Sequence, residues 1–268
     1  MYSGNSISAT GRQYCLNVRG LASMDNLQYL GALRSQNSFS RGDLRVAMND
    51  CGMHISEASF KSKLQWLINS GNIVRVGRNA YCVPSDGMKK YSYKHSELSE
   101  DVAGRLQENH PYLDFTVFEL VQLNEFVNHQ LAHNALFVSV EGALGGFVFD
   151  TLKAAYPGKV LLNPNAGIYH QYWSSDMIAI RKLITESPKD RENPWAARLE
   201  KILVDLVADP LLSASVSESE HPGIYRNAFH KYAVDESCLF RYAKRRGSYG
   251  KICQLITQTG LQLRTRRQ

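Results

Sequence analysis

His129 and His133 have the spacing of the two metal-binding histidines of zinc peptidases, which lie on one face of a helix. In those enzymes a glutamate follows the first histidine and accepts a proton from the metal-bound water. Here that position holds Gln130, and an amide cannot act as the base. No third ligand is evident in the sequence. We therefore interpret both histidines as solvent-facing and predict no metal site.

Asp114 and Glu141 are carboxylates that could hold Mg²⁺ in a nuclease built on a sheet. Such a centre also needs a lysine at the end of a strand. The run Glu-Ser-Pro-Lys that ends at Lys189 has the wrong spacing and contains a proline. A serine nucleophile cannot be assigned either, because no Gly-x-Ser-x-Gly motif is present. The sequence assigns no catalytic residue, and we expect a protein that is not an enzyme.

A glycine-rich run at 141–146 follows a predicted strand and opens a predicted helix, as a nucleotide-binding loop would. It matches neither the dinucleotide nor the Walker A pattern. Glu141 at the start of the helix would also repel a phosphate bound there. We interpret these glycines as positions where a helix packs closely on a sheet, and we expect no cofactor.

Charge is divided into three blocks along the 268 residues. Residues 1–94 hold 12 Lys/Arg against 5 Asp/Glu, residues 95–236 hold 11 against 20, and residues 237–268 hold 8 against none. A basic head and a basic tail thus flank an acidic middle, which indicates different partners for different parts. The five cysteines form no Cys-x-x-Cys pair, and no apolar run is long enough to span a bilayer. We expect a cytoplasmic protein that does not bind membranes.

The basic head predicts three short helices. Ser23, Ser40 and Ser56 each precede apolar residues at helical spacing, so each is expected to cap a helix. Asp43 would complete a capping box with Ser40. The third helix should bury one narrow apolar face and leave small polar and cationic side chains on the other.

Two strand-like runs follow, at 73–76 and 80–83, around a turn in which Gly77 and Asn79 accept positive φ. Three helices and a hairpin form the order of a winged helix, whose third helix enters the major groove of DNA while the hairpin contacts phosphates. Some winged helices bind only proteins, but the charge of the head favours double-stranded DNA. The predicted DNA-binding residues are Ser59, Ser62, Lys63, Trp66, Arg75, Arg78 and Asn79.

The chain is therefore expected to have an α+β fold: a flexible arm over 1–22, a winged helix over 23–84, a linker over 85–95 and a mixed α/β domain over 96–268 that ends in short helices. In the last domain we predict strands at 113–118, 135–140, 159–162 and 177–184, the last with helix as an alternative. Helices are predicted at 96–108, 119–131, 143–156, 195–207, 224–233, 238–246 and 249–258.

Two further segments each have two possible interpretations. The aromatic run 169–173 could stack bases or form core and sheet edge. In the tail, three cations share one side of a predicted helix, which could bind phosphates or a partner, or could pack on the acidic middle of the same domain. The tail candidates are Arg241, Lys244, Arg245 and Arg246.

Four segments, none of them a catalytic motif, resemble the AbiE-type antitoxins of type IV bacterial abortive-infection systems: 73–81, 136–141, 199–205 and 241–247. The likeness covers nearly the whole chain, and the order of its parts carries more weight than any single string. Asn79 departs from this family, which commonly has glycine in the turn of the hairpin.

The resemblance implies a transcriptional autorepressor that binds operator repeats through its winged helix. It also implies that the second domain counteracts a neighbouring nucleotidyltransferase toxin without a stable complex. Two alternatives from other classes remain. One is a DNA-processing enzyme whose winged helix delivers a nuclease-like domain, and the other is a transcription factor whose second domain senses a ligand.

Overall fold

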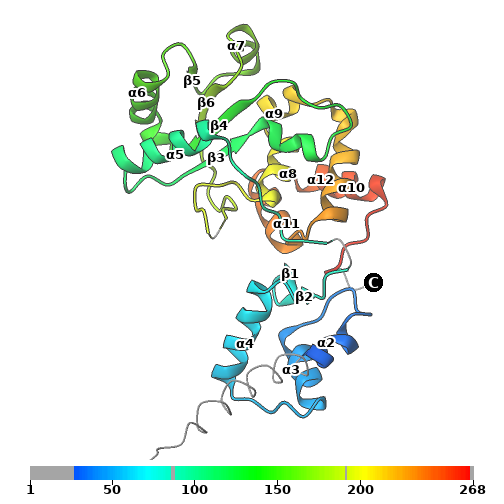
Figure 1. Ribbon diagram of the computed structural model, residues 1–268. Coiled ribbons are helices and arrows are strands. Elements are labelled where there is room, and N and C mark those ends of the chain that lie inside the picture. Colours follow the sequence, from blue (N-terminus) through cyan, green and yellow to red (C-terminus); the bar gives the residue numbers. More distant parts are fainter. Residues whose placement is uncertain (1–26, 86–87, 191, 266–268) are drawn as a thin grey trace, which may run out of the picture. The chain divides into compact units, whose positions relative to one another are not determined.

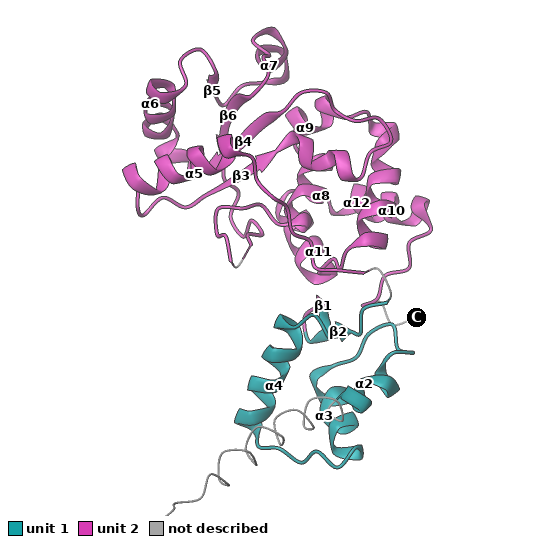
Figure 2. Cartoon of the chain, viewed as in Figure 1, with its two compact units in different colours: residues 1–74, 79–85 teal, residues 75–78, 86–268 magenta. Residues whose placement is uncertain are grey.

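The computed structural model describes residues 27–85, 88–190 and 192–265 (Figure 1). The chain forms two compact units, the first made of residues 1–74 and 79–85 and the second of residues 75–78 and 86–268 (Figure 2). The arm expected over 1–22 and the cap expected at Ser23 lie outside the described residues.

The first unit has the predicted order of three helices: α2 (Gln28–Leu33), α3 (Arg41–Asp50) and α4 (Glu57–Asn69). The capping box is confirmed, since the Ser40 side chain accepts from the Asp43 backbone N–H and the Asp43 carboxylate accepts from the Ser40 backbone N–H. The Ser56 hydroxyl caps α4 by accepting from the Ser59 backbone N–H. These caps fix where α3 and α4 begin.

A two-stranded sheet follows α4, formed by β1 (Val74–Gly77) and β2 (Ala80–Cys82). Gly71, after the end of α4, has φ +73°, and Asn79 in the hairpin turn has φ +52°. Asn79 thus has the positive φ predicted for the turn, whereas the same prediction for Gly77 is wrong, because Gly77 is the last residue of β1. Gly71 uses the left-handed region that a residue without a Cβ adopts readily. Over the described residues 27–85, the observed arrangement is therefore three helices and a hairpin.

The core of the first unit is built from all these elements. Phe60, Leu64 and Leu67 of α4 are buried against apolar residues of α2 and α3, which confirms the predicted inner face of α4. Tyr81 of β2 joins this core beside Phe39, and the two residues also form an isolated bridge. On the opposite face of α4, Ser59, Ser62 and Trp66 are exposed among the residues that the structure describes.

The second unit contains a mixed sheet of four strands in the order β3-β4-β6-β5. β3 (Phe115–Glu119) runs antiparallel to β4 (Ala135–Val140), while β6 (Met177–Lys182) runs parallel to both β4 and β5 (Val160–Leu162). The α+β class predicted from the sequence is confirmed. The segment that begins at Met177 is a strand, and the alternative of a helix there is wrong.

Helices cover both faces of this sheet (Figure 1). On one face, α5 (Glu97–Asn109) and α6 (Gly145–Ala155) pack on Leu136, Val138 and Ile180. On the other face, Phe137 and Ala179 contact the C-terminal helices. Because successive residues of a strand point to opposite faces and both faces are covered, β4 is apolar except for Ser139, and the first four residues of β6 are all apolar.

Five helices form the C-terminal part of the second unit: α8 (Leu199–Ala208), α9 (Pro210–Ser215), α10 (His221–Lys231), α11 (Glu236–Arg245) and α12 (Tyr249–Thr259). The sequence predicted four of them and missed α9. It also missed α7 (Ala166–Gln171), which Asn165 caps by accepting from the Ile168 backbone N–H. Both missed helices are only six residues long, too short for a clear apolar period.

The helix predicted over 119–131 is wrong. The chain forms instead the 3₁₀ helix η2 (Leu120–Glu125) followed by an irregular loop. The buried residues Leu120, Leu123 and Phe126 recur every three positions, which is the period of a 3₁₀ helix. The Asn124 side chain then bonds both the N–H and the C=O of Leu131 and so fixes the loop.

The segment 85–95, expected to be a linker, also makes contacts with the second unit over part of its length. Lys89 exchanges backbone hydrogen bonds with Lys231 and Ala233, and Tyr91 packs edge-on against Tyr232. Residues 88–95 therefore pack on the second unit. Their polar composition concealed this, because backbone pairing places no demand on side-chain type.

Candidate functional site

The outer face of α4 gathers four of the predicted DNA-binding residues. Ser59, Ser62 and Trp66 are exposed and Lys63 is half-buried. Together with Ala58 they line one shallow, open depression on the first unit. They come together because positions three and four apart share one side of a helix, while the buried residues of α4 lie on the other side.

Lys63 and Trp66 form a stacked pair within this face. The Lys63 ammonium nitrogen lies 4.3 Å from the centroid of the Trp66 ring, a cation–π distance. Partial burial lowers the pKa of the Lys63 ammonium. The indole of Trp66 nevertheless remains 48% exposed, although it is among the largest apolar side chains. The pair thus presents a positioned cation beside a half-exposed aromatic side chain.

The two serines are held by local bonds. The Ser62 hydroxyl donates to the Ala58 carbonyl at 3.2 Å, and the Ser59 and Ser56 hydroxyl oxygens lie 3.0 Å apart. The Ser62 oxygen keeps lone pairs that can accept from a base amino group. The chemistry of this face is therefore a cation, a hydroxyl acceptor and an apolar edge.

Sequence reasoning missed two arginines beside the start of α4. Arg41 and Arg45 lie one turn apart on α3, both form ion pairs with Glu57, and both guanidinium groups stack on the Phe60 ring, at 5.1 and 5.4 Å from its centroid. Their side chains stay about 40% exposed, so part of each cation still faces solvent. Their spacing of four residues, which places both on one side of α3, was the signal in the sequence that could have identified them.

The predicted hairpin residues have mixed roles. The Asn79 side-chain oxygen accepts from the Arg41 backbone N–H at 3.1 Å, so it ties the turn to the start of α3. Arg78 is exposed. In residues 75–78, which count with the second unit, Arg75 donates to the Gly77 carbonyl at 3.1 Å and lies 3.5 Å from the Asp235 carboxylate. The Arg75 guanidinium is thus engaged by groups of the same chain, whereas the Arg78 side chain is exposed to solvent.

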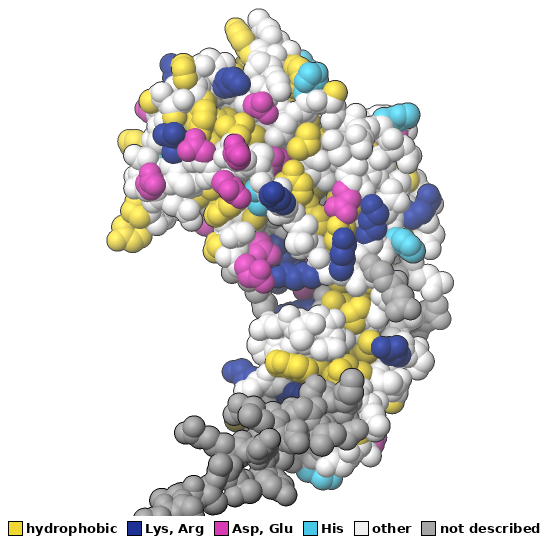
Figure 3. All heavy atoms as spheres, viewed as in Figure 1, with side chains coloured by type: hydrophobic (Ala, Val, Ile, Leu, Met, Phe, Trp, Pro, Cys, Tyr) yellow, Lys and Arg dark blue, Asp and Glu magenta, His cyan; other side chains and the backbone are white. Residues whose placement is uncertain are grey.

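On the tail, three of the four predicted cations lie at the surface of α11. Arg241 is 63% exposed and pairs with the exposed Glu186 at 3.5 Å, and Arg245 donates to the Thr185 hydroxyl at 2.6 Å. Lys244 lies over the Tyr249 ring at 5.0 Å. On the face of the second unit seen in Figure 3, Lys and Arg side chains gather over the helical part, and Asp and Glu over the part near α5.

Arg246 corrects the surface assignment, because it belongs to a buried charge cluster. Its Nε lies 3.2 Å from the Asp205 carboxylate and its Nη2 lies 3.4 Å from that of Asp209, and its side chain is only 15% exposed. Asp205 also pairs with Lys201, and Asp209 pairs with Arg181 at 2.5 Å. The last residue of the basic run is therefore part of the fold.

The residues considered for catalysis are not assembled into a centre. His129 and His133 lie in the loop after η2 instead of on a helix, and the His133 ring packs against Trp173. Asp114 does have a lysine partner, Lys189, which the sequence spacing did not reveal. Nowhere in the described parts of the chain do three or more His, Cys, Asp or Glu side chains gather as a metal ion requires.

The aromatic run divides between core and surface. Tyr169 is buried and stacks on Phe137, whereas Tyr172 and Trp173 are exposed.

Among the residues that the structure describes, no helix has both the length and the apolar character needed to cross a membrane.

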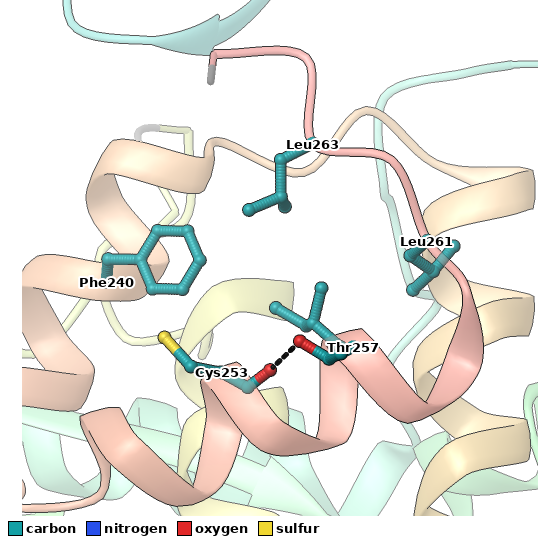
Figure 4. Close-up of a pocket in the computed structure, with 6 residues that line it drawn as sticks. Phe240, Cys253, Thr257, Leu261 and Leu263 are labelled. Carbon is teal, nitrogen blue, oxygen red and sulfur yellow. Dashed lines mark hydrogen bonds between the residues drawn. The ribbon is translucent and has the colours of Figure 1, made fainter. Parts of the chain in front are cut away.

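The second unit also contains a small pocket of about 100 Å³ between α11, α12 and the segment after α12 (Figure 4). Phe240, Cys253 and Leu263 line it, and the Thr257 hydroxyl donates to the Cys253 carbonyl at its wall. Sites for drug-sized ligands usually measure about 300 Å³ or more. This cavity is too small for a ligand of that size.

The family model described as "Family of unknown function (DUF6577)" matches residues 59–262, so the chain belongs to this family. A search of the curated proteins finds no match. Among solved structures, the chain is similar to the crystal structure of RV2827C protein from Mycobacterium tuberculosis, at 10% identity and a TM-score of 0.24, over 89% of this chain and 83% of that chain.

Proposed function

We propose that the protein is a DNA-binding transcriptional regulator and that its first unit is a winged helix with α4 as the recognition helix. The observation that carries this proposal is the outer face of α4, where Ser62, Lys63 and Trp66 line one shallow depression. Small polar, cationic and exposed apolar groups on one helix face are what base edges in the major groove require. The exposed Arg78 in the hairpin supplies a cation for phosphates.

From the resemblance to AbiE-type antitoxins, we propose that the protein represses its own operon and that its second unit counteracts a neighbouring nucleotidyltransferase toxin. Two of the four similar segments, 199–205 and 241–247, support this part. They fall on α8 and α11, which pack together and exchange the ion pair between Asp205 and Arg246. These two segments thus form one packed structure.

DNA binding by the full chain is tested with the duplex upstream of its gene and with random duplex over a series of salt concentrations. Lys63→Ala is expected to weaken binding to the upstream duplex about 5- to 150-fold while affecting random DNA less, because a base contact is lost. Arg78→Ala is expected to weaken both alike and to reduce the salt slope by about 1. Fluorescence anisotropy measures both effects.

The interpretation of the first unit is wrong if the folded full chain shows no salt-sensitive binding to either duplex. It also fails if Lys63→Ala weakens upstream and random DNA equally, since α4 would then contact only phosphates.

Antitoxin activity is tested by co-expressing the chain with the neighbouring toxin gene and measuring cell survival. Arg241→Glu combined with Arg245→Glu reverses two exposed charges and is expected to reduce protection at least tenfold, because attraction to an anionic partner is lost. His129→Ala combined with His133→Ala is expected to keep full protection, because neither ring lies in an assembled centre.

Melting temperatures of both double variants serve as the control for folding. A stable charge-reversal variant that protects fully would show that the α11 surface takes no part. A folded histidine variant that fails to protect would instead point to chemistry at the loop after η2.

A further inference from the structure

We propose that Lys63 and Trp66 act as one reader of a two-base-pair step, a G·C pair next to a pair that carries thymine. This inference rests on the proposed function of α4 and names the sequence that this face recognises. It follows from three properties of the pair: its stacking, its spacing along the helix and its chemistry.

Stacking fixes the cation. The Lys63 ammonium lies 4.3 Å from the centroid of the Trp66 ring and is partly desolvated. A free lysine side chain loses considerable rotamer freedom when it binds. Here the Trp66 ring already limits that freedom, so the ammonium is positioned before DNA binds. Less side-chain entropy is therefore lost on binding than for a lysine without such a contact.

Spacing sets the length of the step. Trp66 follows Lys63 by three residues, which is a rise of about 4.5 Å along an α-helix. Neighbouring base pairs are about 3.4 Å apart along the duplex. Two side chains with this offset on a helix in the major groove therefore reach adjacent base pairs.

Chemistry selects the bases. An ammonium only donates hydrogen bonds, and guanine is the base that offers two adjacent acceptors, N7 and O6, in the major groove. Trp66 is 48% exposed and the carbon atoms of its ring are apolar, and the apolar group in the major groove is the thymine methyl. Lys63 therefore pairs with guanine, and Trp66 contacts the methyl of the neighbouring thymine.

The test begins with a duplex selected by the full chain from a randomised library. In that duplex, each thymine is replaced in turn by deoxyuridine, which lacks the methyl, and each guanine by 7-deazaguanine, which lacks N7. Loss of the methyl at one position is expected to weaken binding about 4-fold. Loss of N7 at the adjacent base pair is expected to weaken binding about 10-fold.

Matched variants assign each penalty to its side chain. Trp66→Ala is expected to abolish the deoxyuridine penalty, and Trp66→Phe, which keeps an apolar edge, to retain part of it. Lys63→Met keeps the stem but not the charge and is expected to abolish the 7-deazaguanine penalty. Lys61→Met makes the same charge change at an exposed site outside the depression and is expected to keep both penalties.

The proposal is overturned if no deoxyuridine position matters, if the two sensitive positions are not adjacent, or if a penalty persists in its matched variant. Binding that is salt-sensitive but selects no sequence would also overturn it, while DNA binding itself would stand. A full chain that binds no duplex at all would refute the proposed function and this inference together.

Discussion

Asp205→Asn is expected to destabilise the second unit by about 3–5 kcal/mol, because it breaks buried ion pairs and leaves the buried Lys201 without its carboxylate partner. The Asp205 carboxylate is 5% exposed and lies between Lys201 and Arg246. Burial alone would raise its pKa, but Lys201, Arg246 and Arg181 hold it below the usual range. The carboxylate is therefore charged in the folded protein, and the cluster depends on that charge.

The cluster makes this substitution costlier than removal of a cation. It contains three cations, Arg181, Lys201 and Arg246, and two carboxylates, those of Asp205 and Asp209. Loss of one carboxylate leaves three buried cations facing one anion. At about 2–4 °C for each kcal/mol in a domain of this size, the melting temperature should fall by about 10 °C.

Glu186→Gln is the matched control, since it removes an exposed carboxylate from an ion pair with Arg241. Exposed pairs contribute about 1 kcal/mol or less, so its melting temperature should stay within about 3 °C of the wild type. Scanning calorimetry of the full chain measures both variants. A loss as small for Asp205→Asn as for Glu186→Gln would show that the cluster does not hold α8 and α11 together.

The pH dependence of the Asp205→Asn variant gives an independent readout. Burial already lowers the pKa of Lys201 in the wild type. Without Asp205 the folded state would hold that proton less tightly than the unfolded state does, so stability of the variant should rise with pH. A destabilisation that stays constant from pH 7 to about pH 9 would mean that the cost comes from packing instead of charge.

Local signals in the sequence were sufficient to predict where α3 and α4 of the first unit begin and which face of α4 is buried. Ser40 and Asp43 fix the start of α3, and Ser56 fixes that of α4, through bonds that span only three residues. The inner face of α4 follows from its helical period, so its outer face, with Lys63 and Trp66, follows as well. In the second unit β4 has the predicted bounds 135–140, because an unbroken apolar run between turns has few other structures open to it.

What the sequence could not provide depends on contacts between distant segments. Arg245 and Arg246 are neighbours with the same side chain, yet one lies at the surface and the other is buried against Asp205. Only the rotation of α11 relative to α8 distinguishes them. Likewise, Lys189 pairs with Asp114, 75 residues away in the sequence, and no local spacing encodes that contact.

Glu119 is the second site at which a single substitution should change stability strongly, and the size of this change should depend on pH. It ends β3, is fully buried, and accepts bonds from the Ser96 backbone N–H at 3.0 Å and the Asn134 side chain at 3.1 Å. His95 lies 3.3 Å away. Burial alone would raise the pKa of Glu119, but His95, the Ser96 backbone N–H and the Ser96 and Ser99 side chains lower it from 4.5 to about 2.

A carboxylate whose pKa is lowered by folding stabilises the folded state above the unfolded pKa and loses that contribution as pH falls through the folded pKa. A shift from 4.5 to about 2 corresponds to about 3 kcal/mol, at 1.36 kcal/mol for each unit. Glu119→Gln lacks the titrating group. The stability difference between wild type and variant should therefore be largest above about pH 5 and shrink by about 3 kcal/mol as pH falls toward 2.

Urea unfolding of both proteins at a series of pH values between about 7 and 2.5 measures this difference. Glu97→Gln removes an exposed carboxylate from the first turn of α5 and should differ from the wild type by less than about 1 kcal/mol throughout. Asn134→Ala removes one donor to Glu119 and so raises the folded-state pKa of this carboxyl. Its acid-dependent loss of stability should therefore be smaller than in the wild type and should be complete at a higher pH. A Glu119→Gln difference that is independent of pH would show that this carboxylate joins α5, β3 and β4 by its shape and hydrogen bonds, and that its charge contributes nothing.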